Sequence, residues 1–113
     1  MTIIAEGAAA WHRGEVHAVE VVRAFLCSVV FCVAGETPAF VALPGAAGSS
    51  YVAVFSDLTQ LAAAYGPVSW FSTTGADLMQ YWPDDHELVL DIAAPHAMRL
   101  PVDVLRLLAT VAA

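Results

Sequence analysis

The chain has 113 residues, a formal charge of −7, and 59% hydrophobic residues against only 13% charged residues. This length fits one domain of ordinary size. The chain has four arginines, no lysine and eleven carboxylates, so it lacks the basic surface that binds nucleic acid or an anionic membrane. We therefore expect neither as a partner.

The apolar content is well above the roughly 45–50% that is typical of soluble domains. A domain of this size cannot bury all of these apolar side chains in its core. An exposed apolar patch on a small domain usually marks a partner site. The alternative is that alanines, which add little to any patch, account for much of it. The composition therefore favours a protein partner, either a second copy of the chain in a homodimer or another protein.

No stretch of the sequence is typical of a membrane span. The longest uncharged apolar stretch, residues 24–35, has 12 residues, fewer than the roughly 20 that a spanning helix needs. No basic region precedes an apolar run at the N-terminus, so no secretory signal is visible. We expect a cytoplasmic protein.

The predicted elements follow from hydrophobic spacing and from turn residues. Residues 1–14 are either a tail or the start of a first helix, with Trp11 as a packing anchor, and apolar residues then recur at helical spacing from Glu15. Gly66 and Pro67 end a later helix, and Pro83 ends another. The expected order is a helix at 15–26, strands at 28–34, 39–43 and 51–55, a helix at 58–65, a strand at 68–72, a helix at 76–82, a strand at 87–93 and a helix at 102–111.

These elements predict a single α+β domain over residues 15–113, with the order α-β-β-β-α-β-α-β-α. The first three strands, joined by short loops, predict an antiparallel meander, and residues 51–94 predict two strand-helix crossovers that complete a mixed sheet. Asp57 with Gln60, and Thr74 with Asp77, resemble capping boxes. In the last strand the alternation predicts that Asp91 points to solvent.

Four segments of the chain together resemble a known family. They are SVVFCV at residues 28–33, YVAVFSD at 51–57, TGADL at 74–78 and PHAMRLP at 95–101. In this order they resemble the SseB-type N-terminal domain family, which is named for a bacterial protein linked to enhanced serine sensitivity. The resemblance covers residues 15–108 and implies a compact α+β domain in a bacterial cytoplasmic protein. It implies no catalytic residues, and fuller relatives continue into a second domain that we expect this chain to lack.

No motif predicts a catalytic, cofactor or metal site. Cys27 and Cys32 match no zinc spacing and are expected to be reduced, buried structural thiols. The run from Asp84 to Glu87 holds three carboxylates and an imidazole, which a solvated turn explains. The alternative is a small metal-dependent enzyme centred on Asp84, Asp85, His86 and His96.

The function expected from the sequence is therefore that of a non-enzymatic protein-interaction domain. Large aromatic residues are enriched at interface hot spots, an arginine can orient a partner carboxylate, and the last helix has a broad apolar face that is suited either to a dimer seam or to docking on the sheet. The predicted partner-binding residues are Trp70, Tyr81, Trp82, Arg99, Leu105 and Leu108.

Overall fold

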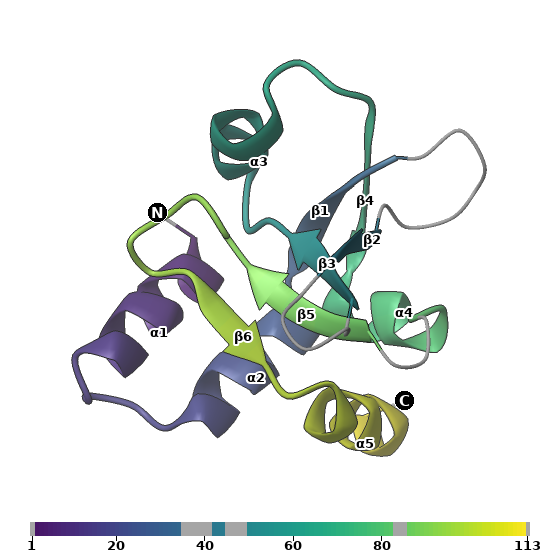
Figure 1. The fold of residues 1–113 in the computed structure, drawn as a ribbon. Coiled ribbons are helices and arrows are strands. Elements are labelled where there is room, and N and C mark those ends of the chain that lie inside the picture. Colours follow the sequence, from purple (N-terminus) through teal and green to yellow (C-terminus); the bar gives the residue numbers. More distant parts are fainter. Residues whose placement is uncertain (1, 35–41, 45–49, 83–85, 113) are drawn as a thin grey trace.

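A computed structural model of the chain describes residues 2–34, 42–44, 50–82 and 86–112 (Figure 1). The fold is α+β, as predicted. Its elements, in chain order, are α1 (Ile3–His12), α2 (Ala18–Cys27), β1 (Val29–Val33), β2 (Ala42–Pro44), β3 (Ser50–Val54), α3 (Leu58–Tyr65), β4 (Trp70–Thr74), α4 (Gly75–Gln80), β5 (His86–Leu90), β6 (Met98–Leu100) and α5 (Val102–Ala112).

The described strands form two sheets. The larger sheet has the order β2-β3-β5-β6, in which β3 and β5 are parallel and the outer pairs are antiparallel. The smaller sheet pairs β1 with β4 in antiparallel fashion. Two backbone hydrogen bonds join the sheets: the Phe31 N–H donates to the Phe55 carbonyl at 2.9 Å, and the Phe55 N–H donates to the Phe31 carbonyl at 2.8 Å.

The strand pairing differs from the predicted meander and crossovers. Among the described strands, β1 pairs with β4 rather than with β2, so β1, β2 and β3 do not form a continuous meander. The parallel pair β3 and β5 is joined by one long connection that contains α3, β4 and α4 together, rather than by two successive crossovers. The predicted elements were correct in kind, but local patterns do not encode which distant strand each one meets.

The core explains why residues 51–55 are uniformly apolar, as expected of a strand with both faces buried. Side chains alternate along β3, so Val52 and Val54 enter the main core beneath the helices, whereas Ala53 and Phe55 enter a smaller cluster with Leu61 of α3. Helices α1, α2 and α5 lie on one side of the larger sheet, and α3 lies away from them beside β1 (Figure 1). No helix in the described part of the chain is both long enough and apolar enough to cross a bilayer.

The N-terminal residues form helix α1, one of the two alternatives left open by the sequence. The Thr2 hydroxyl accepts a hydrogen bond from the Ala5 N–H at 3.1 Å and so caps the helix. Ile4, Ala5 and Ala8 are buried and anchor the helix, whereas Trp11 is 38% exposed, which corrects the expectation that the tryptophan is the packing anchor. Ile4 and Ala5 lie four and three residues before Ala8, so the three side chains share the helical face that packs on the core.

Two predicted helix starts carry the expected caps. The Asp57 carboxylate accepts the Gln60 N–H at 2.8 Å, and the Thr74 hydroxyl accepts the Asp77 N–H at 3.2 Å. Gly66 ends α3 with a φ of 70°, which a residue with a side chain rarely adopts.

Candidate functional site

The predicted partner-binding residues separate into exposed and buried groups. Trp70, Tyr81 and Arg99 are exposed, with Trp70 at 47% and Tyr81 at 74% of their full surface. They lie on β4, after α4 and on β6 respectively, and no ring contact or hydrogen bond among the described residues joins them. The structure therefore does not gather them into one cluster.

Trp82 and Leu105 point inward, which corrects the expectation that they lie at a partner surface, whereas Leu108 is half-buried. Trp82 is buried; its indole N–H donates to the His86 carbonyl at 3.0 Å. Leu105 is also buried, and Leu108 packs against the main core. On α5 the outward positions are instead Val104 and Leu107, one residue earlier in the helical repeat.

The structure separates the residues of the predicted metal alternative. Asp84 and Asp85 lie outside the described residues. His86 begins β5, and His96 follows its far end; the strand alone spans about 13 Å. No group of three histidine, cysteine, aspartate or glutamate side chains within the described ranges is placed to hold a metal ion.

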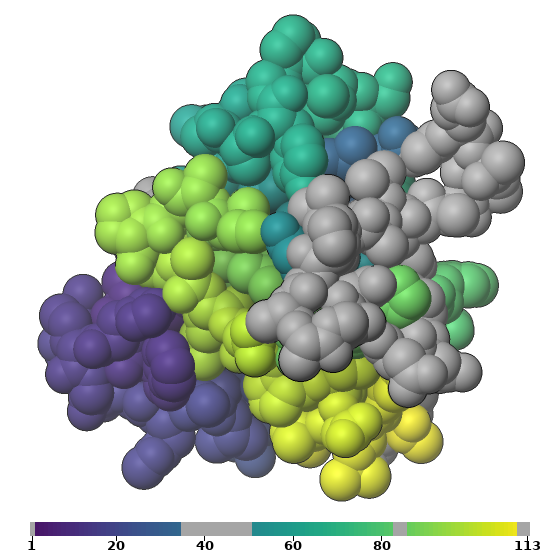
Figure 2. All heavy atoms as spheres, viewed as in Figure 1, coloured from purple at the N-terminus to yellow at the C-terminus, as the bar shows by residue number. Residues whose placement is uncertain are grey.

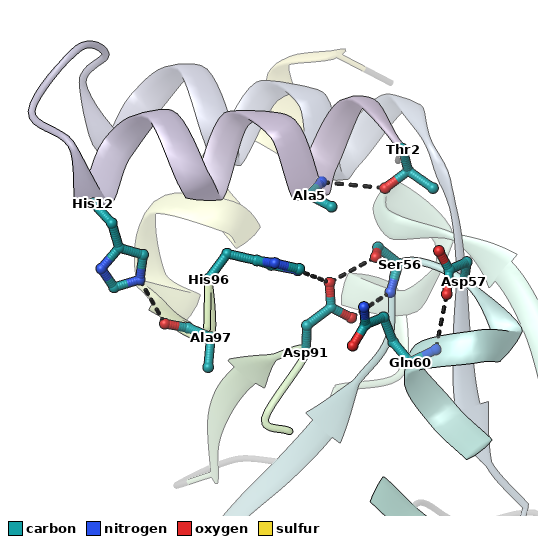
Figure 3. A network of polar contacts seen from close by, with 9 residues as sticks. All are labelled: Thr2, Ala5, His12, Ser56, Asp57, Gln60, Asp91, His96 and Ala97. Carbon is teal, nitrogen blue, oxygen red and sulfur yellow. Dashed lines mark hydrogen bonds and ion pairs between the residues drawn. The ribbon is translucent and has the colours of Figure 1, made fainter. Parts of the chain in front are cut away.

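A buried polar cluster that the sequence pattern did not reveal lies at the carboxyl ends of β3 and β5. Figure 3 shows Ser56, Asp91 and His96 converging beneath α1. The Asp91 carboxylate accepts the Ser56 N–H at 2.8 Å and the Ser56 hydroxyl at 2.6 Å, and the His96 Nε2–H donates to it at 2.7 Å. All three residues are buried.

The inward position of Asp91 corrects the prediction that this residue faces solvent. Strand β5 ends at Leu90, and Asp91 has a φ of 48°, so the two-residue alternation stops one position before it. Aspartate tolerates this left-handed conformation better than most residues. A backbone bond of 2.9 Å from the Asp91 N–H to the Val54 carbonyl holds the turn beside β3.

The geometry of the Ser56, Asp91 and His96 cluster is structural rather than nucleophilic. In a serine hydrolase the histidine lies between the serine and the carboxylate, so that it can take the serine proton. Here the carboxylate is central and receives both donors, and the serine hydroxyl is bonded to it directly. The cluster fixes the turns after β3 and β5 relative to each other, and the bond from His12 to the Ala97 carbonyl at 2.7 Å attaches α1 above it.

The two cysteines have opposite environments. Cys27 is exposed at the end of α2, whereas Cys32 is buried in β1. Burial raises the pKa of the Cys32 thiol to about 12, because the core disfavours the thiolate. The exposed position of Cys27 corrects the expectation that both cysteines are buried, whereas Cys32 lies in the core as expected.

Alkylation of the folded protein should therefore distinguish the two thiols. At pH 8, iodoacetamide is expected to modify Cys27 and to leave Cys32 unmodified until the chain is unfolded, since the thiolate is the reactive species. Peptide mass spectrometry of native and urea-treated samples measures this. Equal modification of both cysteines in the native sample would contradict the buried position of Cys32.

A second feature that sequence reasoning missed is a lobe almost without charge. We define the charge-poor lobe as residues 29–34 and 50–76, which include β1, β3, α3 and β4. Within these described residues Asp57 is the one charged side chain, and it caps α3; none of the four histidines lies there. The signal was present in the sequence, because residues 24–76 contain only Glu36 and Asp57 as charged residues.

The surface of the charge-poor lobe is apolar at several points. Val29 (53%), Leu58 (40%) and Trp70 are exposed large apolar side chains. The Trp70 ring packs edge-on against Phe31, with 5.7 Å between the ring centroids. Figure 2 shows α3 and the segment after it as one continuous teal surface at the top of the molecule.

Tyr65 lies in an apolar part of the lobe. Tyr65 packs edge-on against Phe55, with ring centroids 5.8 Å apart. Burial raises the pKa of the Tyr65 hydroxyl, and the nearby Tyr51 hydroxyl acts in the same direction. The phenol therefore remains uncharged at physiological pH.

A groove of about 540 Å³ lies between α4 and α5 in the described part of the molecule. Asp77 and Arg106 are among its lining residues, and the Arg106 guanidinium donates to the Trp82 carbonyl at 2.9 Å. The arginine is therefore engaged in holding α5 against the end of α4. This groove adds no group arranged for chemistry.

Comparison with known proteins identifies a family but no individual relative. No curated protein and no solved structure shows significant similarity to the chain. The sequence model of the family described as SseB protein N-terminal domain matches residues 5–107, which is nearly the whole chain. This match extends over both sheets, the buried cluster and the charge-poor lobe, and the chain belongs to the SseB N-terminal domain family.

Proposed function

We propose that this domain is a non-enzymatic protein-interaction domain that associates with a second copy of itself through the charge-poor lobe. The observation that carries the proposal is the near absence of charge from the described residues of this lobe, on whose surface the apolar side chains of Val29, Leu58 and Trp70 are exposed. The other described elements carry most of the charged groups.

Two physical arguments support this surface as an interface. Charged residues are depleted at the cores of protein interfaces, where aromatic residues are enriched, and the lobe has both properties. Two copies of a chain with a charge of −7 also repel each other, so they approach at least cost through neutral surfaces. Contact through the charge-poor lobe keeps the acidic parts of the two copies apart.

The size of the molecule is compatible with such a contact. Its accessible surface is 6326 Å², and a stable interface covers about 800 Å² on each partner. That is roughly an eighth of the surface, which a lobe built from β1, β3, β4 and α3 can supply.

The polar groups give less support to an enzyme. Ser56, Asp91 and His96 satisfy one another inside the protein, and His86 lies at the opposite end of β5 from His96. Acid–base or metal-assisted chemistry needs such groups to converge at a site that a substrate can reach.

Added charge on the lobe should weaken self-association. Leu58→Glu and Ala62→Glu place a carboxylate at exposed positions of α3, and at Leu58 the charge lies in the first turn, where it favours the helix. Each variant is expected to raise the dimer dissociation constant at least about tenfold, because two like charges would face each other across the interface. Sedimentation velocity over a concentration series measures the effect.

Leu107→Glu is the matched control, because Leu107 is 65% exposed on α5, outside the lobe. It should leave the dissociation constant unchanged. Selective dissociation by Leu107→Glu would assign the interface to α5 instead. A wild-type chain that remains monomeric at every concentration would contradict self-association.

A further inference from the structure

The two edges of β4 differ in how their backbone groups are used. Phe31 directs its N–H and C=O toward Phe55, which follows β3. The backbone N–H and C=O groups of the alternate residues Val30 and Cys32 must therefore point toward β4. Their partners in the register are Thr73 and Phe71. The flanking bonds, Gly75 N–H to the Ser28 carbonyl at 3.0 Å and Ala34 N–H to the Ser69 carbonyl at 2.9 Å, follow the same alternation.

The remaining residues of β4, Trp70, Ser72 and Thr74, therefore direct their backbone N–H groups away from β1, and Trp70 and Ser72 direct their C=O groups the same way. Among the described strands, β1 is the one that pairs with β4. The outward edge thus presents a row of backbone donors and acceptors in extended geometry, which is a template for another strand.

The edge of β4 lacks the usual protection against pairing. Natural edge strands are blunted by short length, by charged side chains or by proline. The two outer strands of the larger sheet follow this rule: β2 has three residues and ends at Pro44, and β6 has three residues, carries Arg99 and precedes Pro101. Strand β4 has five residues, WFSTT, with no charge and no proline.

We propose that two copies of the domain pair antiparallel through the outward edges of β4, forming a continuous sheet β1-β4-β4-β1 across a two-fold axis. This inference rests on the proposed function and names the interface within it. A strand that pairs with its own copy in antiparallel orientation forms a self-complementary contact, as a two-fold dimer requires.

The alternation of backbone groups sets the register. Outward residues must pair with outward residues, and the register with full overlap places Ser72 opposite the partner's Ser72. Trp70 then lies opposite the partner's Thr74. On the same face, Val29 is the register partner of Thr74 within each copy, so the exposed Trp70 of one copy lies in one row with the partner's Thr74 and the partner's Val29.

The choice of a second copy over another protein follows from charge. Strand β4 lies within residues 58–76, which contain no charged residue, so the surface offers neither a carboxylate for a basic partner nor a cation for an acidic one. A neutral strand edge is complementary to itself, and the two acidic halves remain apart.

Cysteine cross-linking tests the register in the full-length chain. Residues directly opposite in a hydrogen-bonded antiparallel pair have Cα atoms about 5.5 Å apart, within the range of a disulfide. In a Cys27→Ser background, Ser72→Cys is expected to become predominantly a covalent dimer under mild oxidation. Thr59→Cys, exposed on α3 in the same lobe, is the matched control and should remain mostly monomeric.

Two edge variants test the interface without a cross-link. Ser72→Pro removes an N–H that points away from β1, so the β1–β4 ladder keeps its bonds, and Ser72→Lys adds the charge that edge strands commonly carry. Both should raise the dimer dissociation constant at least about tenfold while circular dichroism stays native. Leu107→Lys, with the same added charge on α5, should have no effect.

The outcomes separate this inference from the proposed function. A dimer that is weakened by Leu58→Glu, yet unaffected by both Ser72 variants and not cross-linked through Ser72→Cys, overturns pairing through β4 and keeps the lobe as the interface. A chain that is monomeric throughout overturns both. Cross-linking at position 72 together with dissociation by Ser72→Lys supports the continuous sheet.

Discussion

Replacing Gly75 with alanine is expected to destabilise the domain by about 3 kcal/mol or more, enough to leave much of the population unfolded. Gly75 is the first residue of α4, and it lies directly against α2. A Cβ atom there would lie 2.1 Å from the Phe25 carbonyl oxygen and 2.7 Å from its carbonyl carbon. These are backbone atoms of α2 and cannot rotate away, so the two helices would have to separate and disturb the core around Phe25.

Gly7→Ala is the matched control for this substitution. At Gly7, inside α1, the nearest atom to an added Cβ is a side-chain carbon of Val21 at 3.7 Å, which is ordinary contact. Alanine there should stabilise the fold by about 0.5–1 kcal/mol, because it favours a helix interior more than glycine does. Urea denaturation followed by circular dichroism measures both. A free energy of unfolding for Gly75→Ala within 1 kcal/mol of wild type, as a rough threshold, would show that α2 and α4 are not packed as described.

Replacing Asp91 should have the second large effect. Asp91→Ala leaves the Ser56 N–H, the Ser56 hydroxyl and the His96 ring N–H without their acceptor inside the protein, and we expect a loss of about 3–5 kcal/mol. It also places alanine at a φ of 48°, which adds strain. Asp91→Asn should cost less than Asp91→Ala, because asparagine tolerates this conformation and keeps one acceptor oxygen.

Asp103→Asn provides the reference for removing a carboxylate from this acidic chain. Asp103 is exposed in the first turn of α5, so its loss should change the free energy of unfolding by no more than about 0.5 kcal/mol. Equal effects of Asp91→Asn and Asp103→Asn in urea denaturation would refute a structural role for the buried carboxylate.

Local structure was the part of the fold that the sequence predicted well. The bounds of α3 match the predicted range of residues 58–65, because Asp57 caps one end and Gly66 with Pro67 closes the other. The burial of Val52 to Phe55 likewise followed from an uninterrupted apolar run. In each case the signal lies within a few residues of the feature.

Strand pairing and the buried cluster could not be predicted in the same way. The partner of β1 is about 40 residues away in sequence, and a strand pattern is the same for any partner. Asp91 fitted a solvated position in the predicted strand 87–93, but β5 ends at Leu90, and its partner Ser56 is separated from it by 35 residues. Both depend on the three-dimensional arrangement of distant segments.

The candidate interface shows the same division between local and distant information. Trp70 was predicted to be able to face outward and is exposed. Leu105 was assigned to a partner surface but is buried, because the apolar residues of α5 cover all but one narrow polar side of the helix and the pattern does not show which of them meet the sheet. The charge-poor lobe could have been found from the spacing of charges along the chain. The charge-poor segments form one lobe because β1 pairs with β4, and the sequence does not predict that pairing.

The long excursion between β3 and β5 has a kinetic consequence. The two strands can align only after the 31 residues from 55 to 85 have been gathered into a closed loop, and the entropy of that closure opposes alignment by about 3 kcal/mol. Chains dominated by such remote pairings refold on the scale of milliseconds to seconds rather than microseconds. Completion of the larger sheet therefore depends on this closure, because β5 cannot pair with β3 before the intervening residues have been gathered.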